Sequence, residues 1–440
     1  MSREWSKIAK ILFLLILPAA GVLYVLSVLW PSFFRIGFYA IVGLFVLQAA
    51  LIYGYTVKAA SRERTLAVPP VAGSPLPRTT FIVSAYLPNE ISVVGATVSH
   101  ILRNVTRPSA GIEVILVYNT SPEALFEDKL RTIKGRWPEL ILEHAQASSS
   151  KSENLNVALG KATGDMIVLL DADHLVAGDC IWRAWRWLEA GYDAVQGLCK
   201  VRNLSEGVVP SLVGIEFEVK YGVYDESRSA VFRTGFFGGS NGYWKAEAIK
   251  TLGFDRVILT EDIDVTLRGA LAGFKFVHDK SIVSTELAPK ALSNLWFQRK
   301  RWTQGWLQCL LKYQKDVWDT GRLSPLQKIS WTIMLTGGVV YDVVSFLFFP
   351  WVLVWWIRAG RISLPVDPYT VGAFLFMVLT IPLQMIVIFR NATPPRPPAS
   401  HYLLYATLAW PYAVFKTVLQ IVAIRDEWAG ERAWTLSARH

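Results

Sequence analysis

The sequence predicts a water-facing α/β domain inserted between blocks of α-helical transmembrane segments. Of the 440 residues, 52% are hydrophobic and 18% are charged, and the mean hydropathy of +0.32 is too high for an ordinary soluble domain. Long apolar segments stand at both ends, whereas the middle alternates short β-branched runs with amphipathic segments. We therefore expect a membrane hairpin and linker over residues 1–71, a domain over 72–327, and membrane segments with a tail over 328–440.

Two apolar segments, residues 11–30 and 36–57, open the chain. Each is close to the roughly 20 residues that cross a bilayer, so they predict a helical hairpin. No small-residue cleavage site precedes the second segment, which favours a hairpin over a cleavable signal peptide. Basic residues flank the hairpin and only Arg35 lies in its turn, so the positive-inside tendency places the middle domain in the cytoplasm of a multi-pass plasma (inner) membrane protein. The flanking residues are Arg3, Lys7, Lys10, Lys58, Arg62 and Arg64.

Three apolar segments follow the middle domain, at residues 329–357, 371–389 and 402–424. The number of crossings stays open, because three full crossings would leave the basic C-terminal tail outside, against the positive-inside tendency. Pro350 interrupts the first segment, and Pro411 and Lys416 interrupt the third. These interruptions favour kinks or an interfacial position over straight spans.

The middle domain alternates predicted strands and helices. Residues 78–85, 112–118 and 165–170 are short β-branched runs, and residues 91–105 and 122–134 have helical spacing. This alternation predicts a mixed, mostly parallel sheet with helices on both faces. Ligands of such sheets bind beyond the carboxyl ends of the strands. The residues that follow each run therefore become candidates, namely 86–90, 119–121 and 171–173.

Two carboxylates, Asp171 and Asp173, directly follow the third run. Residues two apart at a strand end project toward the same side, so this pair can share one hard cation with diphosphate oxygens. Such pairs also arise in turns and solvated caps. Upstream, Lys151 opens the string Lys-Ser-Glu-Asn-Leu-Asn, which either places a cation and amides near a nucleotide or begins a surface helix.

A glycine-rich run, Phe-Phe-Gly-Gly-Ser-Asn-Gly, begins at Phe236. It suits a loop that approaches a flat polar ligand, with ring faces available for sugar stacking, or an ordinary turn before a helix at 245–252. Further on, Thr260, Glu261 and Asp262 open a second helical pattern at 263–272. Thr260 is a candidate N-cap and the acids favour the positive helix end, but a carboxylate at a helix start in a cleft can also accept a proton.

The segment 295–306 is basic and aromatic and stands just before the C-terminal membrane block. It is typical of an interfacial amphipathic helix whose cations reach lipid headgroups. A second interpretation has Arg301 neutralising a leaving diphosphate and Trp302 stacking beneath an acceptor sugar. One helix can serve both purposes.

Cysteine content and net charge exclude some classes of function. Cys180, Cys199 and Cys309 form no close pair and have no His at metal-ligand spacing, so we expect neither a disulfide framework nor a zinc site. The net charge of +10 fits anionic lipid headgroups and phosphate binding. No nucleic-acid motif accompanies it, so we expect no nucleic-acid partner.

Three motifs together carry a family resemblance: Asp171-x-Asp173, Thr260-Glu-Asp262, and Gln298-Arg-x-Arg-Trp302. In this order, with the glycine-rich run between them, they resemble the membrane-integrated family 2 glycosyltransferases. That family includes cellulose, hyaluronan and poly-N-acetylglucosamine synthases and ceramide glucosyltransferase-like enzymes. The resemblance implies a GT-A fold, an inverting hexosyltransferase-like reaction with a nucleotide-sugar donor, expected to be a UDP-sugar, and a divalent cation, Mg or Mn.

The resemblance also implies roles for individual residues. Asp262, beside Glu261, would be the general base, and Asp171 and Asp173 would hold the cation. The remaining expected residues bind either donor or acceptor. For the donor they are Asn119, Lys151, Asp171, Asp173, Gln298, Arg299 and Arg301, and for the acceptor Phe237, Gly239, Ser240 and Trp302.

Two departures from the family pattern bear on specificity. Many relatives carry an acidic loop after the second strand, where this chain has Asn119, and cellulose synthases have Cys where this chain has Gly239. Their Phe-x-Val-Thr gating string is also missing, which disfavours cellulose synthesis. We expect transfer to a growing membrane-associated polysaccharide. The alternatives are a glycolipid synthase that sugars a lipid hydroxyl and, from another class, a non-enzymatic membrane binding subunit with a degenerate donor site.

Overall fold

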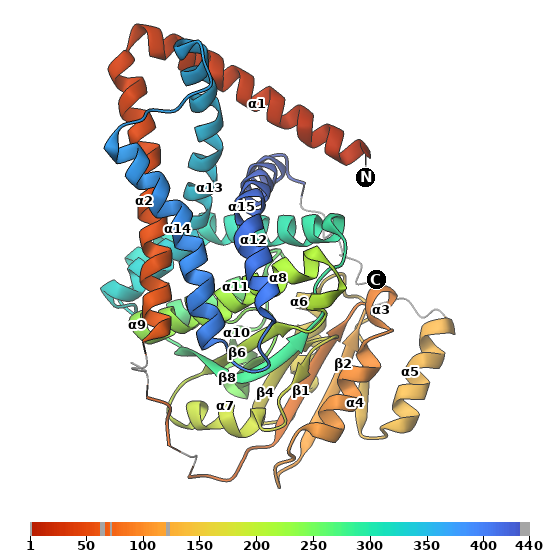
Figure 1. Ribbon diagram of the computed structural model, residues 1–440. Coiled ribbons are helices and arrows are strands. Elements are labelled where there is room, and N and C mark those ends of the chain that lie inside the picture. Colours follow the sequence, from red (N-terminus) through yellow and green to blue (C-terminus); the bar gives the residue numbers. More distant parts are fainter. Residues whose placement is uncertain (1, 62–66, 71–72, 120–123, 432–440) are drawn as a thin grey trace.

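A computed structural model describes residues 2–61, 67–70, 73–119 and 124–431 (Figure 1). Arg62, Arg64, Thr120 and Ser121, which entered the sequence-based expectations, lie outside the described residues. A sheet domain with its covering helices occupies the lower half of Figure 1, and a bundle of long helices stands above it. The chain enters the sheet domain from the bundle and returns to the bundle after it.

The sheet domain is built on eight strands in the order β3-β2-β1-β4-β7-β6-β8-β5. The β1–β2, β2–β3, β1–β4 and β6–β8 pairs are parallel, whereas β7 is antiparallel to β4 and β6, and β5 is antiparallel to β8. The mixed, mostly parallel sheet agrees with the prediction. The strands are β1 (Thr79–Ala85), β2 (Ile112–Tyr118), β3 (Leu140–His144), β4 (Met166–Asp171), β5 (Leu175–Val176), β6 (Ala194–Val201), β7 (Gly242–Lys245) and β8 (Phe276–Glu286).

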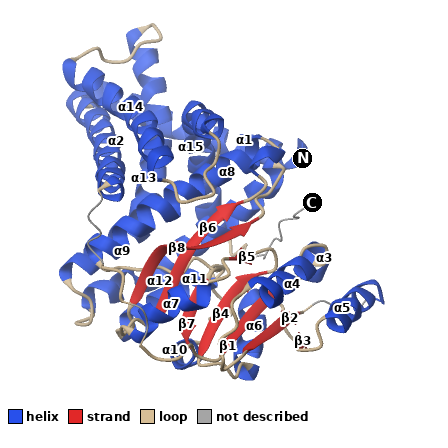
Figure 2. Ribbon diagram, turned by 60° about the horizontal axis from the view of Figure 1, so that its bottom comes forward, coloured by secondary structure: helices blue, strands red, loops and turns tan. Residues whose placement is uncertain are grey.

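Helices cover both faces of this sheet (Figure 2). Alternate side chains of a strand point to opposite faces, so Phe81 of β1 packs in one core and Ile82 in the other. Both faces are buried, which explains the unbroken apolar runs of the central strands. The first core is shared with α4 (Val94–Asn104), α5 (Ala124–Arg136) and α7 (Cys180–Glu189), and the second with α6 (Lys151–Lys161), α10 (Ala246–Leu252), α11 (Glu261–Ala272) and α12 (Leu292–Asp319).

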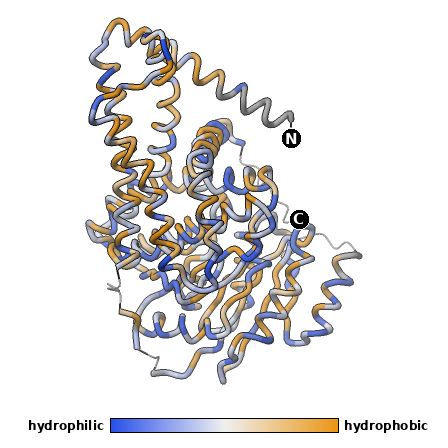
Figure 3. The backbone as a smooth tube through the Cα atoms, in the orientation of Figure 1, coloured by the Kyte–Doolittle hydropathy of each residue, from blue (hydrophilic) through white to orange (hydrophobic). Residues whose placement is uncertain are grey.

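Five long helices form the bundle. Four of the described helices, α2, α13, α14 and α15, are long and apolar enough to cross a membrane, and residues Phe13–Leu29 of α1 add a shorter apolar stretch. The apolar colouring of Figure 3 follows the same helices, so the chain is a membrane protein. Their bounds are α1 (Ser2–Leu29), α2 (Pro31–Ala60), α13 (Pro325–Ala359), α14 (Pro368–Asn391) and α15 (Ala399–Trp428).

A third layer lies between the sheet and the bundle. Phe217, Leu295 and Tyr412 pack together there, from α8, α12 and α15 respectively. The ammonium group of Lys200 on β6 forms a buried ion pair with Glu218 and also donates to the Thr393 carbonyl oxygen, beyond α14. The basic-aromatic segment is therefore fixed between the sheet domain and the membrane helices. The remaining elements are α3 (Leu87–Glu90), η1 (Leu204–Glu206), α8 (Val208–Val219), the π-helix η2 (Lys220–Asp225) and α9 (Glu226–Phe232).

Candidate active site

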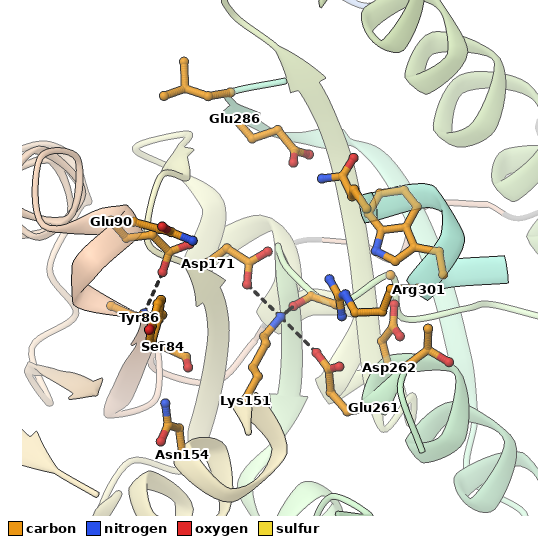
Figure 4. Close-up of a pocket in the computed structure, with 18 of the residues that line it drawn as sticks. Ser84, Tyr86, Glu90, Lys151, Asn154, Asp171, Glu261, Asp262, Glu286 and Arg301 are labelled. Carbon is orange, nitrogen blue, oxygen red and sulfur yellow. Dashed lines mark hydrogen bonds and ion pairs between the residues drawn. The ribbon is translucent and has the colours of Figure 1, made fainter. Parts of the chain in front are cut away.

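A polar cleft of about 150 Å³ lies at the carboxyl ends of β1 and β4. Its walls come from α3, the start of α6, the start of α11 and the first half of α12 (Figure 4). The cleft thus lies where the parallel-sheet rule places a ligand. It is lined by Ser84, Ala85, Tyr86, Asn89, Glu90, Asn119, Lys151, Asn154, Asp171, Gly238, Gly239, Thr260, Glu261, Asp262, Glu286, Leu287, Pro289, Gln298, Arg301 and Trp302.

Lys151 links three walls of the cleft. Its ammonium nitrogen lies 2.7 Å from a carboxylate oxygen of Asp171 and 3.0 Å from one of Glu261, and it donates to the Gly239 carbonyl oxygen at 2.9 Å. Figure 4 shows Lys151 rising between the two acids. Burial acts to lower the pKa of Lys151, but the two carboxylates outweigh burial and raise it. The group is therefore a fixed positive charge at the floor of the cleft.

The first residues of α11 present two acids to the same space. Thr260 occupies the N-cap position as expected, although its side chain makes no capping hydrogen bond. Burial, and then the neighbouring Glu261 carboxylate, raise the pKa of Asp262 to about 7, while Lys151 acts in the opposite direction. Asp262 is thus an acid that changes protonation near neutral pH, as an efficient general base requires.

Gly239 brings backbone close to Asp262. Its φ of +88° lies in the left-handed region that favours glycine, and a β-carbon there would stand 3.2 Å from Oδ2 of Asp262. A larger residue would press on the carboxylate. The glycine-rich run is therefore the cleft loop that the sequence predicts at this point.

Helix α12 contributes Gln298, Arg301 and Trp302 to the cleft. These positions are three and four residues apart and share one helix face. Arg301 donates to the Leu259 carbonyl oxygen at 3.3 Å, just before α11. Arg299 lies behind this face: it pairs with Glu216 at 2.5 Å, and its guanidinium carbon stands 4.2 Å from the ring centroid of Trp302. The structure thus places Arg299 behind the cleft wall, whereas Arg301 of the same motif lines the cleft.

Three further residues from the expected site lie behind the cleft wall. Oδ2 of Asp173, in a fully buried side chain, accepts from the Leu287 backbone N–H at 2.8 Å. Oγ of Ser240 accepts from the Asp171 backbone N–H at 3.0 Å, and the ring of Phe237 packs against Trp244. All three support the cleft from behind in this structure. The expected residues that line the cleft are Asn119, Lys151, Asp171, Gly239, Glu261, Asp262, Gln298, Arg301 and Trp302.

Several lining residues have no counterpart among the sequence-based candidates. Tyr86 and Glu90 follow the first predicted strand, so the strand-end rule had marked their segment without giving them a role. Asn154 belongs to the Lys151 string. Glu286 ends β8, a strand that the sequence analysis does not predict, so no signal marked it. Its carboxylate also lies near His174 and Cys199, with ligand atoms of the three within 4.8 Å of one another.

The cleft offers ligands that suit a divalent cation. The carboxylates of Asp171 and Glu286 line it and are directed into the same space in Figure 4, whereas Glu261 is engaged by Lys151, which also pairs with Asp171. Carboxylate oxygens are the ligands that Mg²⁺ and Mn²⁺ prefer. The residues present therefore fit such an ion.

Comparison with known proteins decides the family. The model of the glycosyltransferase like family 2 matches residues 77–305, which contain the whole cleft. The chain belongs to glycosyltransferase family 2. The match confirms the resemblance that the three motifs carry and makes the protein an enzyme of that family.

Curated relatives of the chain are polysaccharide synthases by name. The chain is 25% identical over 271 residues to a poly-beta-1,6-N-acetyl-D-glucosamine synthase of Staphylococcus aureus (strain COL), with 61% of this chain and 64% of that protein covered. It therefore spans less than two thirds of that relative. A synthase of the same name from Staphylococcus epidermidis is 25% identical over 321 residues, covering 71% of this chain and 73% of the relative.

A solved structure confirms the fold. The chain matches a mannosyltransferase from Pyrobaculum calidifontis, solved in complex with GDP-Man and Mn²⁺, with a TM-score of 0.63 and 20% identity. The match covers 90% of this chain and 99% of that one. The predicted GT-A-like domain between membrane helices is confirmed.

Proposed function

We propose that this family 2 enzyme transfers a sugar, with inversion, from a nucleotide-sugar donor to a growing membrane-associated polysaccharide. One observation carries the proposal: Asp262, whose pKa is raised to about 7, faces the same cleft as Asp171 and Arg301. A base and a diphosphate-binding set in one cleft are the groups that transfer from a nucleotide sugar needs.

For the donor, Arg301 and Lys151 would face the diphosphate as fixed cations. Asp171 would hold Mg or Mn, with Asp173 supporting its strand end; the bound ion would neutralise charge on the diphosphate. The solved mannosyltransferase, which is in complex with GDP-Man and Mn²⁺, supports a nucleotide sugar and a divalent cation. Asn119 donates to the Ser148 carbonyl oxygen, and its own Oδ1 is buried with no hydrogen-bond partner among described residues, so Oδ1 suits an imide N–H such as that of uracil.

For the transfer, Asp262 would take the proton from the acceptor hydroxyl as that oxygen forms its bond to the anomeric carbon. The bond from that carbon to the diphosphate breaks on the opposite face, and its electron pair leaves with the diphosphate. A single displacement inverts the anomeric centre, so the cleft needs one base and no nucleophilic side chain. Glu261, held by Lys151, would keep the pKa of Asp262 high enough for proton transfer.

For the acceptor, Trp302 would provide a ring for a terminal sugar, with Gly239 allowing close approach beside Asp262. The names of the curated relatives, which are polysaccharide synthases, support a polymer. Trp302 lies in the layer between the sheet and the membrane helices. A polymer that ends at Trp302 could therefore leave the cleft toward the bundle.

A glycolipid product is the second candidate, and a specific cavity favours it. An apolar cavity of about 400 Å³ lies between α2 and α13, with Tyr224 and Arg228 among its few polar residues. Arg228 pairs with Asp225, which in turn pairs with Lys220 at 3.1 Å, and a β-carbon at Gly238 would stand 3.3 Å from Lys220 Nζ. This series of contacts connects the cavity to the cleft loop, and the apolar lining of the cavity would suit the tail of a lipid acceptor.

Product analysis separates these candidates. Membranes containing the full chain are supplied with UDP-sugars one at a time, and nucleotide release is measured beside Asp262→Asn. Release by the wild type that falls about a thousandfold in the variant supports the base; equal release refutes it. A mass ladder of products supports the polymer, whereas one sugar on an extractable lipid supports the glycolipid.

We also propose that the cleft faces the cytoplasm and that the membrane is the plasma (inner) membrane. The basic residues outside the α1–α2 hairpin support this orientation. A single cysteine introduced at exposed Lys129 should react with a membrane-impermeant maleimide only after cells are opened. Labelling of this cysteine in intact cells would contradict the proposal and place the cleft outside the cytoplasm.

A further inference from the structure

We propose that a second cavity, on the other side of the sheet domain from the cleft, binds the phosphate group of an anionic ligand. The cavity has a volume of about 380 Å³. Its walls are the segment after α9, the end of α11, the start of β8, and the segment that leads from α12 into α13. The residues that the argument uses are Tyr192, Arg233, Gly273, Lys275, Arg322 and Trp331.

Three cations line this cavity without a matching acid. In the part of the chain that the structure describes, Arg233, Lys275 and Arg322 form no ion pair with a carboxylate. Arg322 donates to the Ala272 carbonyl oxygen at 3.0 Å. Asp193, the acid next to Lys275, accepts from its backbone N–H at 2.8 Å and pairs with Lys245 at 3.8 Å instead. Three like charges around one cavity favour an anion, and a phosphate best satisfies two guanidinium groups and an ammonium.

A buried donor supplies an independent observation. Trp331 is 1% exposed and lines the cavity, and its indole Nε1 has no hydrogen-bond partner among the described residues. A buried N–H without an acceptor is costly, so it calls for an oxygen that the protein does not provide. The ring of Trp331 forms part of the cavity wall, so an occupant held by the three cations would pack against this residue.

The cavity lies at the end of the membrane helices. Trp331 belongs to the second turn of α13, one of the helices apolar enough to cross a membrane. On the other side, the Ser227 hydroxyl of α9 donates to the Tyr55 carbonyl oxygen near the end of α2, and Figure 1 shows α9 at the lower end of that helix. A phospholipid headgroup or a soluble phosphate could therefore reach the cavity.

Two segments run directly from this cavity to the active-site cleft. Arg233 is followed by the run that reaches Gly239, and α11 begins with Glu261 in the cleft and ends beside Gly273 in the cavity. An occupant would thus contact both segments that carry the proposed catalytic loop and acid. An effect on sugar transfer rests on the proposed function, whereas binding itself does not.

Lipid retention tests the proposal. The full chain is purified in detergent without donor sugar, and bound phosphatidylglycerol is titrated by native mass spectrometry against phosphatidylcholine. The double variant Lys275→Gln with Arg322→Gln should weaken phosphatidylglycerol binding about thirtyfold and leave phosphatidylcholine unaffected. A double variant with the same charge loss on exposed α5 residues, Lys129→Gln with Arg136→Gln, should bind as the wild type does.

Two further arms make the result decisive. The exchange Lys275→Arg with Arg322→Lys keeps both charges, so it should keep binding within about threefold and rule out a general folding defect. Inorganic phosphate, titrated alone and followed by the thermal midpoint, distinguishes a soluble anion from a lipid headgroup. Binding of either probe that depends on Lys275 and Arg322 supports the proposal. Equal binding of both probes by the wild type and the glutamine variant overturns it.

Discussion

Thr260 packs directly against the α-carbon of Gly305. A β-carbon at Gly305 would stand 2.3 Å from the Thr260 Oγ1 and 2.4 Å from its Cγ2. Thr260 precedes the acids of α11, and Gly305 follows Trp302 on α12 by one turn. This contact therefore sets the distance between the proposed base and the proposed diphosphate and acceptor groups.

Gly305→Ala should separate α11 from α12. The added methyl group cannot fit beside the branched Thr260 side chain, so we expect a loss of about 1–3 kcal/mol in the free energy of unfolding and a lower thermal midpoint. Nucleotide release should fall as well, because Arg301 and Asp262 move apart. Gly160→Ala is the control: Gly160 lies in α6, and apart from its chain neighbours and the backbone of its own helix no described atom lies within 4 Å of the new β-carbon, so the change should be neutral or stabilising. An unchanged melting temperature in Gly305→Ala would mean that the helices adjust freely.

The pH dependence of sugar transfer should report on Asp262. The general base must be deprotonated, and burial and Glu261 raise the pKa of Asp262 to about 7. We therefore expect kcat/KM to rise with pH up to about 7 and to lose about tenfold for each unit below it. Glu261→Gln removes the negative charge that raises the pKa of Asp262. The acid limb of the profile, which is the fall in kcat/KM at low pH, should therefore move to lower pH. If the fall in kcat/KM at low pH occurs at the same pH in Glu261→Gln as in the wild type, a group other than Asp262 controls it.

The sequence predicts some strands of the sheet and misses others, and the side chains of each strand explain the difference. The strands around Phe81 and Val114 have apolar residues on both faces, and such runs predict strands directly. Strand β6 is not predicted, because Gln196 and Lys200 interrupt its apolar run. Both are buried with partners from distant segments: Gln196 donates to the Ser240 carbonyl oxygen, and Lys200 pairs with Glu218. Local sequence carries no sign of such partners.

The candidate site shows the same division. Spacing along the chain marked Asp171, Asp262 and Arg301, which the fold brings to one cleft. The direction of Asp173 did not follow from two-residue strand spacing, because the chain turns after Asp171, where the His174 N–H donates to the Asp171 carbonyl oxygen. Side chains alternate between the two faces only within a strand, so this rule does not predict the direction of a residue beyond the strand end.

Lys151→Gln should shift the acid limb in the direction opposite to Glu261→Gln. Lys151 lowers the pKa of Asp262, so its removal should raise that pKa and move the limb to higher pH. Donor KM should also rise, by about tenfold, because a cation facing the diphosphate is lost. Lys161→Gln, on the exposed end of the same helix, should change neither quantity. Parallel shifts in the Lys151 and Glu261 variants would contradict the assigned electrostatics.

Arg299 should act on the acceptor through Trp302. Its guanidinium stacks on the Trp302 ring and pairs with Glu216, which also accepts from the Tyr412 hydroxyl at 2.9 Å. Arg299→Lys keeps the charge beside Glu216 but loses the flat stacking surface, so acceptor KM should rise about three- to thirtyfold while donor KM and kcat stay within about twofold.

The control for this contact is Lys416→Ala, which removes the other cation near Glu216, at 3.7 Å, without touching Trp302. It should leave acceptor KM unchanged, because the stacked pair of Arg299 and Trp302 stays intact. Steady-state kinetics with donor and acceptor varied separately make the measurement. A rise in donor KM with unchanged acceptor KM in Arg299→Lys would instead place Arg299 with the diphosphate group, as the motif alone suggests. An equal loss in kcat for both variants would indicate a role limited to holding α8, α12 and α15 together.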